Sequence, residues 1–273
     1  MNKHSCDTLP AYARSALNRC NLPAIILGGI TFQLHPKALR LDSMAYLHQP
    51  FFRSIAEIHN PQKRSDCFHD YMSSCFLLDN KDEAGFNDNS RVKRAKADYL
   101  RLLRGWLFNA DGIEAAVLKY WVASRFGLLC QNHNGCLRDP HGRAFAQYQA
   151  DFMRGLYNAN ALESQLDLLY SFCQYELVRR FPRRQHWHLY RGINHLTEFD
   201  VLAYGDDHEK VLLNNLNSFS ASVDTAGIFG DRVLSVAVPS SKILYFPGLL
   251  PGVLQGEEEF MVLGGVYQVK HHR

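Results

Sequence analysis

Gly256-Glu257-Glu258-Glu259-Phe260-Met261-Val262-Leu263 is the stretch of this 273-residue chain that decides its fold. Three carboxylates run without a break into an apolar segment of the kind that forms a buried strand. Acidic triplets usually lie on solvated helix faces, but a strand that follows at once places at least one carboxylate at the mouth of a sheet. The stretch therefore predicts a C-terminal sheet with a polar site at its edge.

The rest of the chain beyond residue 182 also has a sequence pattern typical of extended strands. Short runs rich in β-branched and aromatic residues alternate with Gly, Asn, Asp and Pro, which is typical of strands and turns. A short helix is expected within residues 206–216 and a helical turn at 224–229. Strands are predicted at residues 186–193, 216–220, 233–238, 242–246, 260–263 and 266–270.

The chain before residue 182 is mostly helical in pattern. Apolar residues recur there at spacings of three and four, which places them on one face of a helix. A short helix is expected at 11–19, a buried strand or extended segment at 24–32, and an exposed loop at 78–90. Helices are predicted at residues 42–58, 61–76, 99–107, 113–126, 145–156 and 162–177.

This order of elements predicts an α+β fold. Helices that precede a run of strands do not make a parallel α/β sheet, because that architecture needs the two to alternate. We expect residues 1–182 to form a mostly helical region packed on a β-rich core of residues 183–273. The two parts are expected to make one integrated domain.

Composition excludes several classes of protein. A net charge of +3, from 30 basic and 27 acidic residues, lacks the basic excess typical of nucleic-acid-binding proteins. The apolar run at 22–30 is short and broken by Pro and Gly, so it predicts neither a signal peptide nor a membrane segment. Seven cysteines without regular spacing indicate free thiols in a reducing compartment, which favours the cytoplasm.

One loop contains three side chains capable of binding a metal, Cys130, His133 and Cys136. A structural zinc site usually has a fourth ligand and a tighter Cys-x-x-Cys knuckle. A polar loop without a metal is therefore the favoured interpretation. The sequence also contains neither the glycine-rich fingerprint of a Rossmann site nor that of a P-loop.

Three predicted strands each supply a polar group to the C-terminal half. Taken alone, Arg191 reads as an edge-strand arginine in a salt bridge, and the Glu triplet reads as a solvated turn. Ser220 and Ser222 are expected to alternate on one strand and to face the same side. None of the three features is diagnostic by itself.

Their order along the chain resembles that of the arginine-directed mono-ADP-ribosyltransferases. The resemblance lies in Tyr190-Arg191-Gly192, in Phe219-Ser220-Ala221-Ser222 followed by Ala226 and Phe229, and in Glu257-Glu258-Glu259-Phe260. Ala221 stands where Thr is commoner in that superfamily. The helical phrases at 102–108 and 117–128, together with the ending Gly-Glu-Glu-Glu-Phe-Met-Val-Leu-Gly-Gly, are similar to the dinitrogenase reductase ADP-ribosyltransferases of nitrogen-fixing bacteria. This second resemblance spans most of the chain.

The resemblance implies a transferase that uses NAD as its substrate. The acceptor would be an arginine of dinitrogenase reductase, the iron protein of nitrogenase, and its modification would switch nitrogen fixation off. The resemblance also implies control by a PII-type nitrogen-signalling protein. The helical region is then the expected docking surface for the target protein.

The resemblance also implies a role for each site residue. Glu259 would be essential for NAD cleavage, Glu257 would position the acceptor guanidinium, and Glu258 would matter least. Ser220 would orient the glutamate or the nicotinamide ribose, and Arg191 would grip the diphosphate. The expected NAD-binding residues are Tyr190, Arg191, Gly192, Ser220, Ser222 and Phe229, with Gly192 allowing close approach of the nicotinamide amide.

Two other functions remain open at this point. The same fold could modify an arginine of another protein, or use water as the acceptor and so act as an NAD glycohydrolase. A different class is a non-catalytic interaction protein with a degenerate transferase-like domain.

Overall fold

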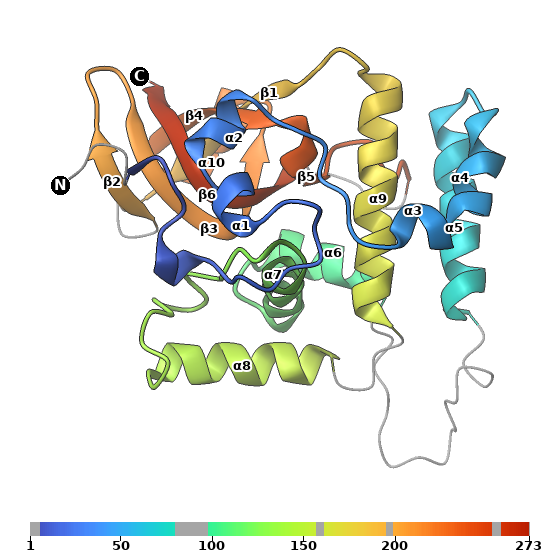
Figure 1. Ribbon diagram of the computed structural model, residues 1–273, viewed down its shortest axis with the longest axis horizontal. Coiled ribbons are helices and arrows are strands. Elements are labelled where there is room, and N and C mark those ends of the chain that lie inside the picture. Colours follow the sequence, from blue (N-terminus) through green and yellow to red (C-terminus); the bar gives the residue numbers. More distant parts are fainter. Residues whose placement is uncertain (1–5, 80–97, 157–160, 195–198, 253–257, 273) are drawn as a thin grey trace.

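The computed structural model describes residues 6–79, 98–156, 161–194, 199–252 and 258–272. Helices dominate its first part and strands its second, which confirms the predicted α+β class (Figure 1). The helices are α1 (Ala24–Leu27), α2 (Ile30–Leu34), α3 (Met44–Leu47), α4 (Gln49–Ala56), α5 (Pro61–Phe76), α6 (Tyr99–Phe108), α7 (Ile113–Phe126), α8 (Arg143–Leu156), α9 (Leu162–Arg180) and α10 (Val223–Ile228). The strands are β1 (His186–Ile193), β2 (Asp200–Tyr204), β3 (Glu209–Ser220), β4 (Arg232–Pro239), β5 (Ile243–Tyr245) and β6 (Glu259–His272).

Several predicted elements differ from those in the structure. Residues 24–32 hold α1 and the start of α2 instead of a strand, because Pro23 caps α1 and Gly28-Gly29 divide the two helices. Residues 206–216 belong largely to β3 instead of a helix, because pairing with β6 overrides the local pattern. The helix expected at 11–19 is a single 3-10 turn, Ala11–Ala13. Strand β2 was not predicted, and most of the loop expected at 78–90 lies outside the described residues.

The two strands predicted at the C-terminus form one long strand, β6. Its pairing with β3 shifts register between Leu213 and Leu216, opposite the Gly264-Gly265 pair. A Cβ on Gly264 would lie 1.6 Å from the carbonyl oxygen of Asn214, so only glycine fits against this irregularity. Gly264 and Gly265 lie between the two predicted strands, but in the structure they accommodate a bulge within one strand.

The sheet is antiparallel and closes on itself. Its strand order is β2-β3-β1-β4-β6-β5, and an additional pairing joins β3 to β6. β1 pairs with β4 along its whole length but meets β3 at a single residue pair, Tyr190 with Ser220. That single pair lies where β3 ends, so the end of β3 is flanked by β1 on one side and β6 on the other.

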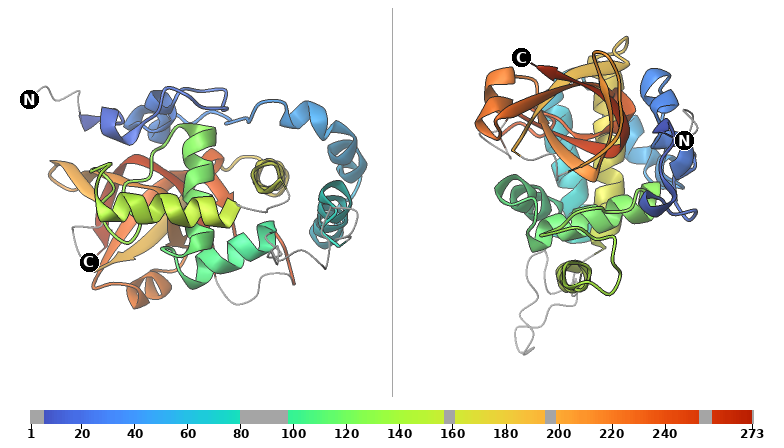
Figure 2. Two further views of the ribbon diagram at one scale, coloured as in Figure 1. Left: turned by 90° about the horizontal axis from the view of Figure 1, so that it is seen from below. Right: turned by 90° about the vertical axis from the view of Figure 1, so that its left-hand side faces the viewer.

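The helices cover the sheet from several sides. α1 and α2 lie on one face, and α6 and α10 lie on the opposite face (Figure 2). Asn215 ties β3 to the helical part, since its amide donates to the carbonyl oxygens of Lys119 on α7, at 2.7 Å, and of Leu128, at 3.1 Å. α9 lies against β5, with α4 and α5 beyond it (Figure 1).

One hydrophobic cluster contains buried residues of both parts of the chain, from Leu9 to Val269. Buried ion pairs join the helices within it, with Arg64 of α5 on Glu176 of α9 and Arg125 of α7 on Asp167 of α9. On this basis we propose that regions 1–182 and 183–273 fold together as one integrated domain. Within the described ranges, no helix combines the length and the apolar character needed to cross a membrane.

Lys242 is a charged side chain placed inside this core. It is fully buried, its ammonium donates to the carbonyl oxygen of Gly264 at 2.9 Å, and it lies 4.5 Å from the ring centroid of Tyr267. Burial lowers the pKa of Lys242 from its usual value to about 7. The unfolded chain returns this amine to a pKa of about 10.4, so folding costs free energy wherever the unfolded amine is charged.

We expect Lys242→Met to stabilise the protein, most strongly at low pH. The wild type loses stability as the pH falls from about 10.4 to about 7, because the unfolded state binds one more proton in that window. The gain in the free energy of unfolding at about pH 6 should be on the order of 4 kcal/mol, reduced by about 1 kcal/mol because the hydrogen bond to Gly264 is lost. Urea unfolding at about pH 6 and about pH 10 measures it. Lys63→Met, at an exposed position of α5, is the control, and an equal gain at both pH values would contradict the argument.

Candidate active site

Three sequence motifs meet where β3 ends. Ser220 is the pairing partner of Tyr190 in β1 and also of Glu259, the first residue of β6. Residues directly opposite in an antiparallel pair lie on the same face of the sheet, about 5 Å apart. The structure therefore brings the arginine, serine and glutamate motifs together through backbone pairing.

A cavity of about 540 Å³ opens at this junction. Predicted site residues that line it are Tyr190, Arg191, Gly192, Ser220, Phe229 and Glu259. Further lining residues that the sequence did not single out for a site include Trp106, Phe108, Ser218, Ile228 and Glu258. Ser222 lies outside the set of described residues that line the cavity, and Glu257 falls outside the described part of the chain.

Among the described residues, Trp106 and Ser218 donate hydrogen bonds to Glu259. The indole Nε1 of Trp106 donates to its Oε1 at 2.8 Å, and the hydroxyl of Ser218 donates to the same oxygen. Trp106 Nε1 also lies 3.0 Å from the Ser218 hydroxyl oxygen. Trp106 is almost completely buried and lines the same cavity as Glu259, so the indole holds the carboxylate at the cavity wall.

The serines are arranged differently from the prediction. Ser220 ends β3, whereas Ser222 is the N-cap of α10 and accepts a hydrogen bond from the Thr225 amide at 3.2 Å. The Ser222 amide in turn donates to the Ser220 hydroxyl at 3.0 Å. The expectation that Ser220 and Ser222 alternate on one strand is wrong, because the chain turns into a helix between them. Ser218, two residues earlier on the same strand face, is the serine that contacts Glu259.

Arg191 stands at the boundary between two cavities. Its Nη1 donates to the carbonyl oxygen of Ser218 at 2.9 Å, which adds a second link between β1 and β3. Besides the main cavity, it lines a smaller one of about 280 Å³ on the side of α7. Polar residues of that second cavity include Asp111, Lys119, Asn132, Asn214 and Asn217.

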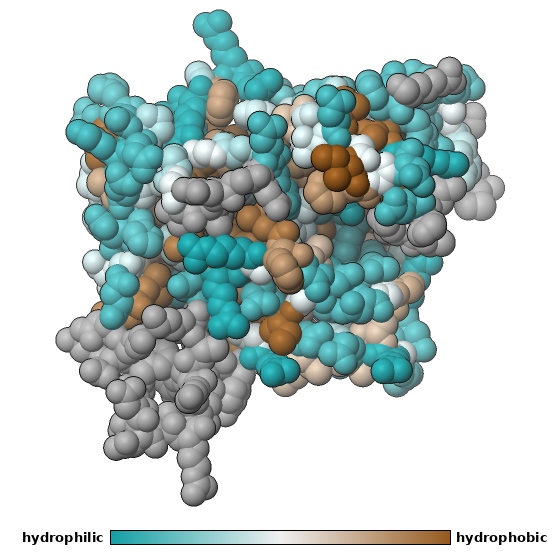
Figure 3. All heavy atoms as spheres, turned by 180° about the vertical axis from the view of Figure 1, so that it is seen from behind, coloured by the Kyte–Doolittle hydropathy of each residue, from teal (hydrophilic) through white to brown (hydrophobic). Residues whose placement is uncertain are grey.

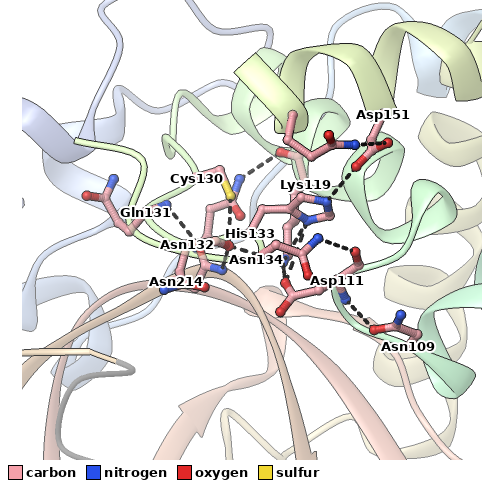
Figure 4. Close-up of polar contacts among 12 residues, drawn as sticks. Asn109, Asp111, Lys119, Cys130, Gln131, Asn132, His133, Asn134, Asp151 and Asn214 are labelled. Atoms are coloured by element: carbon pink, nitrogen blue, oxygen red, sulfur yellow. Dashed lines mark hydrogen bonds and ion pairs between the residues drawn. The ribbon is translucent and has the colours of Figure 1, made fainter. Parts of the chain in front are cut away.

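A polar network supports the wall of the second cavity (Figure 4). The buried ammonium of Lys119 donates to Asp111 at 2.8 Å and to the carbonyl oxygen of Asn132 at 3.1 Å, and lies 3.3 Å from His133 Nδ1. Burial acts to raise the pKa of Asp111, but the charge and hydrogen bond of Lys119 outweigh it and lower that pKa. Burial, and then Lys119, lower the pKa of His133 and outweigh the opposite effect of Asp111 and Asp151.

The same network accounts for the loop that contains Cys130, His133 and Cys136. The Cys130 thiol donates to the Asn132 carbonyl oxygen, and burial raises its pKa to about 11. The described residues contain no group of three His, Cys, Asp or Glu side chains that could hold a metal.

Trp106 is a residue of the candidate site that the sequence analysis did not identify. In the helical pattern it falls on the apolar face of α6 and reads as a core residue. The one signal available was chemical, since a buried indole N–H requires an acceptor. Nothing in a single sequence indicates that the acceptor is a glutamate of a strand more than one hundred residues away.

Gly192 packs against α10. A Cβ at this position would lie 2.0 Å from the carbonyl oxygen of Ala226. The close approach that glycine permits here is therefore that of the α10 backbone to β1. This contact seats α10, whose last residues reach the cavity.

We expect Gly192→Ala to destabilise the protein by about 1–3 kcal/mol, because the added methyl group pushes α10 away from β1. Gly227→Ala is the matched control, since a Cβ there would meet no atom of the described residues within 4 Å. Alanine within a helix should leave stability unchanged or raise it by up to about 1 kcal/mol. Thermal or urea unfolding compares the two, and equal effects would contradict the packing argument.

Comparison with known proteins agrees with the resemblance seen in the motifs. The chain matches the family described as Dinitrogenase reductase ADP-ribosyltransferase (DRAT) over residues 17–271. It is 35% identical over 257 residues to the NAD(+)--dinitrogen-reductase ADP-D-ribosyltransferase of Rhodospirillum rubrum, and the match covers 93% of each chain. No solved structure matches the chain. Since the family match extends over the helical part as well as the sheet, the chain belongs to the dinitrogenase reductase ADP-ribosyltransferase family.

Proposed function

We propose that this protein transfers ADP-ribose from NAD to an arginine of dinitrogenase reductase. The observation that carries the proposal is the Glu259 carboxylate, held by Trp106 and Ser218 at a cavity that Arg191 also lines. Family membership supports the same substrate and acceptor. Modification of the acceptor would switch nitrogen fixation off.

The first step breaks the bond between the ribose C1′ and the nicotinamide nitrogen. Nicotinamide leaves with the electron pair, and positive charge develops on the ribose, as in glycoside hydrolysis. Glu259 would hold the ribose 2′-hydroxyl and stabilise this charge. Because the carboxylate interacts more strongly with the cation than with intact NAD, it lowers the barrier to cleavage.

Trp106 and Ser218 would keep this carboxylate in place before the substrate arrives. Both donors converge on Oε1, so the side chain does not have to be reoriented during the reaction. Fixed dipoles of this kind cost no reorganisation at the transition state. Trp106 and Ser218 are therefore proposed as positioning residues for Glu259.

Arg191 would hold the diphosphate that joins the two halves of NAD. Its guanidinium lines both cavities, and an anionic group between two nucleosides fits that position. The nicotinamide half would occupy the larger cavity, where Tyr190, Ser220 and Phe229 lie. Gly192 would contribute by seating α10, and Ser222 by capping it.

The second step forms a bond from a guanidinium nitrogen of the acceptor to C1′. The guanidinium must lose a proton as it attacks, and a nearby carboxylate can accept it. Glu257 is the proposed acceptor of that proton, on the sequence pattern alone. A PII-type regulator and a cytoplasmic location complete the proposal. The first is supported by the sequence resemblance, the second by the dependence on NAD and by the free cysteines among the described residues.

NAD labelled on its adenylate side tests the proposed function. Label on dinitrogenase reductase supports arginine transfer, free ADP-ribose alone indicates a glycohydrolase, and no turnover indicates a non-catalytic protein. Glu259→Gln should reduce NAD cleavage at least about 100-fold, because it keeps an oxygen for Trp106 and Ser218 but removes the charge. Glu258→Gln is the neighbouring control and should retain cleavage. Full cleavage by Glu259→Gln would refute the mechanism.

Trp106→Phe should lower kcat for NAD cleavage by about 10- to 100-fold and leave KM for NAD within about twofold. Loss of the donor should also raise the pKa of Glu259, so the acid limb of the pH–rate profile should move to higher pH. Trp121→Phe is the matched control, because Trp121 Nε1 donates to a different carboxylate, that of Asp167, at 2.7 Å. This control should affect stability but not the pH profile. Identical profiles for Trp106→Phe and wild type would exclude the positioning role.

A further inference from the structure

Two apolar side chains at the opening of the main cavity are exposed to solvent. Phe108 ends α6 and is 93% exposed, and Ile228 ends α10 and is 79% exposed. Both line the cavity beside Glu258 and Glu259. Full exposure of a large apolar side chain at a functional opening has no folding benefit, and such positions commonly mark interaction surfaces. We call Phe108 and Ile228 the apolar rim.

The two helices that carry the apolar rim lie on the same face of the molecule (Figure 2). Figure 3 shows this face, on which apolar side chains form small patches among mostly hydrophilic ones. The rim residues come from different helices but line the same cavity. A macromolecule that inserts a side chain toward Glu259 would therefore cover both of them.

Charge indicates what kind of partner fits this opening. The carboxylates of Glu258 and Glu259 line the cavity next to the rim, and Glu258 is exposed. Carboxylates attract a guanidinium and repel further anions such as a second nucleotide. We propose that the apolar rim docks the acceptor protein. The acceptor surface that binds there carries an arginine flanked by apolar residues, and these apolar residues pack on Phe108 and Ile228.

This proposal depends on the proposed function and adds how the protein acceptor is selected. Phe229, 66% exposed beside Ile228, is left out of the rim because it is assigned to NAD. A small guanidine needs only the carboxylates and the NAD-bound cavity. A folded protein also needs the rim, since a few buried apolar anchors supply most of the affinity of a protein interface.

Phe108→Ser and Ile228→Ser test the proposal with three readouts on the full chain. These are transfer to dinitrogenase reductase, transfer to agmatine as a small guanidine, and NAD hydrolysis. Each variant should raise KM for the protein acceptor by roughly 5- to 30-fold, the usual effect of losing one apolar anchor. The ratio of KM for the protein acceptor to KM for agmatine should therefore rise by about the same factor, and a far-UV circular dichroism spectrum like that of wild type shows that each variant is folded.

Matched controls use equally exposed apolar residues away from the cavity. Tyr46→Ser on α3, 83% exposed, and Leu17→Ser, 84% exposed, should leave all three readouts unchanged. Phe108→Leu, which keeps an apolar side chain, should recover most of the loss in Phe108→Ser.

Three outcomes would overturn the proposal. The first is an unchanged KM for the protein acceptor, and the second is an equal loss with agmatine. The third is found by analytical ultracentrifugation, if the wild type is a dimer and both serine variants are monomers. The rim would then join two copies of this chain. If wild type fails to cleave NAD at all, the proposed function itself is wrong, and that result is distinct from these three.

Discussion

The double pairing of Ser220 is the constraint on which the rest of the structure depends. Its neighbours across the sheet are Tyr190 and Glu259, so the end of β3 fixes both other motifs through backbone hydrogen bonds. A slip of one residue in either pairing would turn a motif to the opposite face. The bulge at Gly264 and the long β1–β4 pairing preserve this register at a distance from the site.

The helical region contributes directly to the candidate site. Trp106 of α6 donates to the Glu259 carboxylate, and the start of α6 is tied to α9, because the Tyr99 amide donates to the Gln165 side chain at 3.0 Å. α9 in turn packs against β5. A shift of α6 relative to the sheet would therefore move the indole that donates a hydrogen bond to Glu259. This connection is a physical reason to treat the two regions as one domain.

Sequence reasoning succeeded where a local pattern decides the outcome. The bounds of α7 and β1 follow from periodicity and turn residues, and the apolar run after the Glu triplet predicted the strand that begins at Glu259. It failed where tertiary contacts decide. Pairing with β6 makes 209–216 a strand, and the turn after Ser220 makes Ser222 a helix cap. The Trp106 contact could not be predicted either, because apolar periodicity is the same for a core tryptophan and for one that donates to a carboxylate of the candidate site.

The ends of α6 and α10 connect the proposed acceptor surface to the residues of the candidate site. Phe108 lies two residues beyond Trp106 on the last turn of α6, so force on the rim acts on the turn that positions Glu259. α10 is anchored at Ser222, which is hydrogen-bonded to Ser220, and ends at Ile228. On each helix, only a short segment therefore separates the rim residue from a residue that contacts the junction of β1, β3 and β6. Docking of a protein at the rim would restrain both segments, which gives a physical route by which the acceptor could tighten the candidate site.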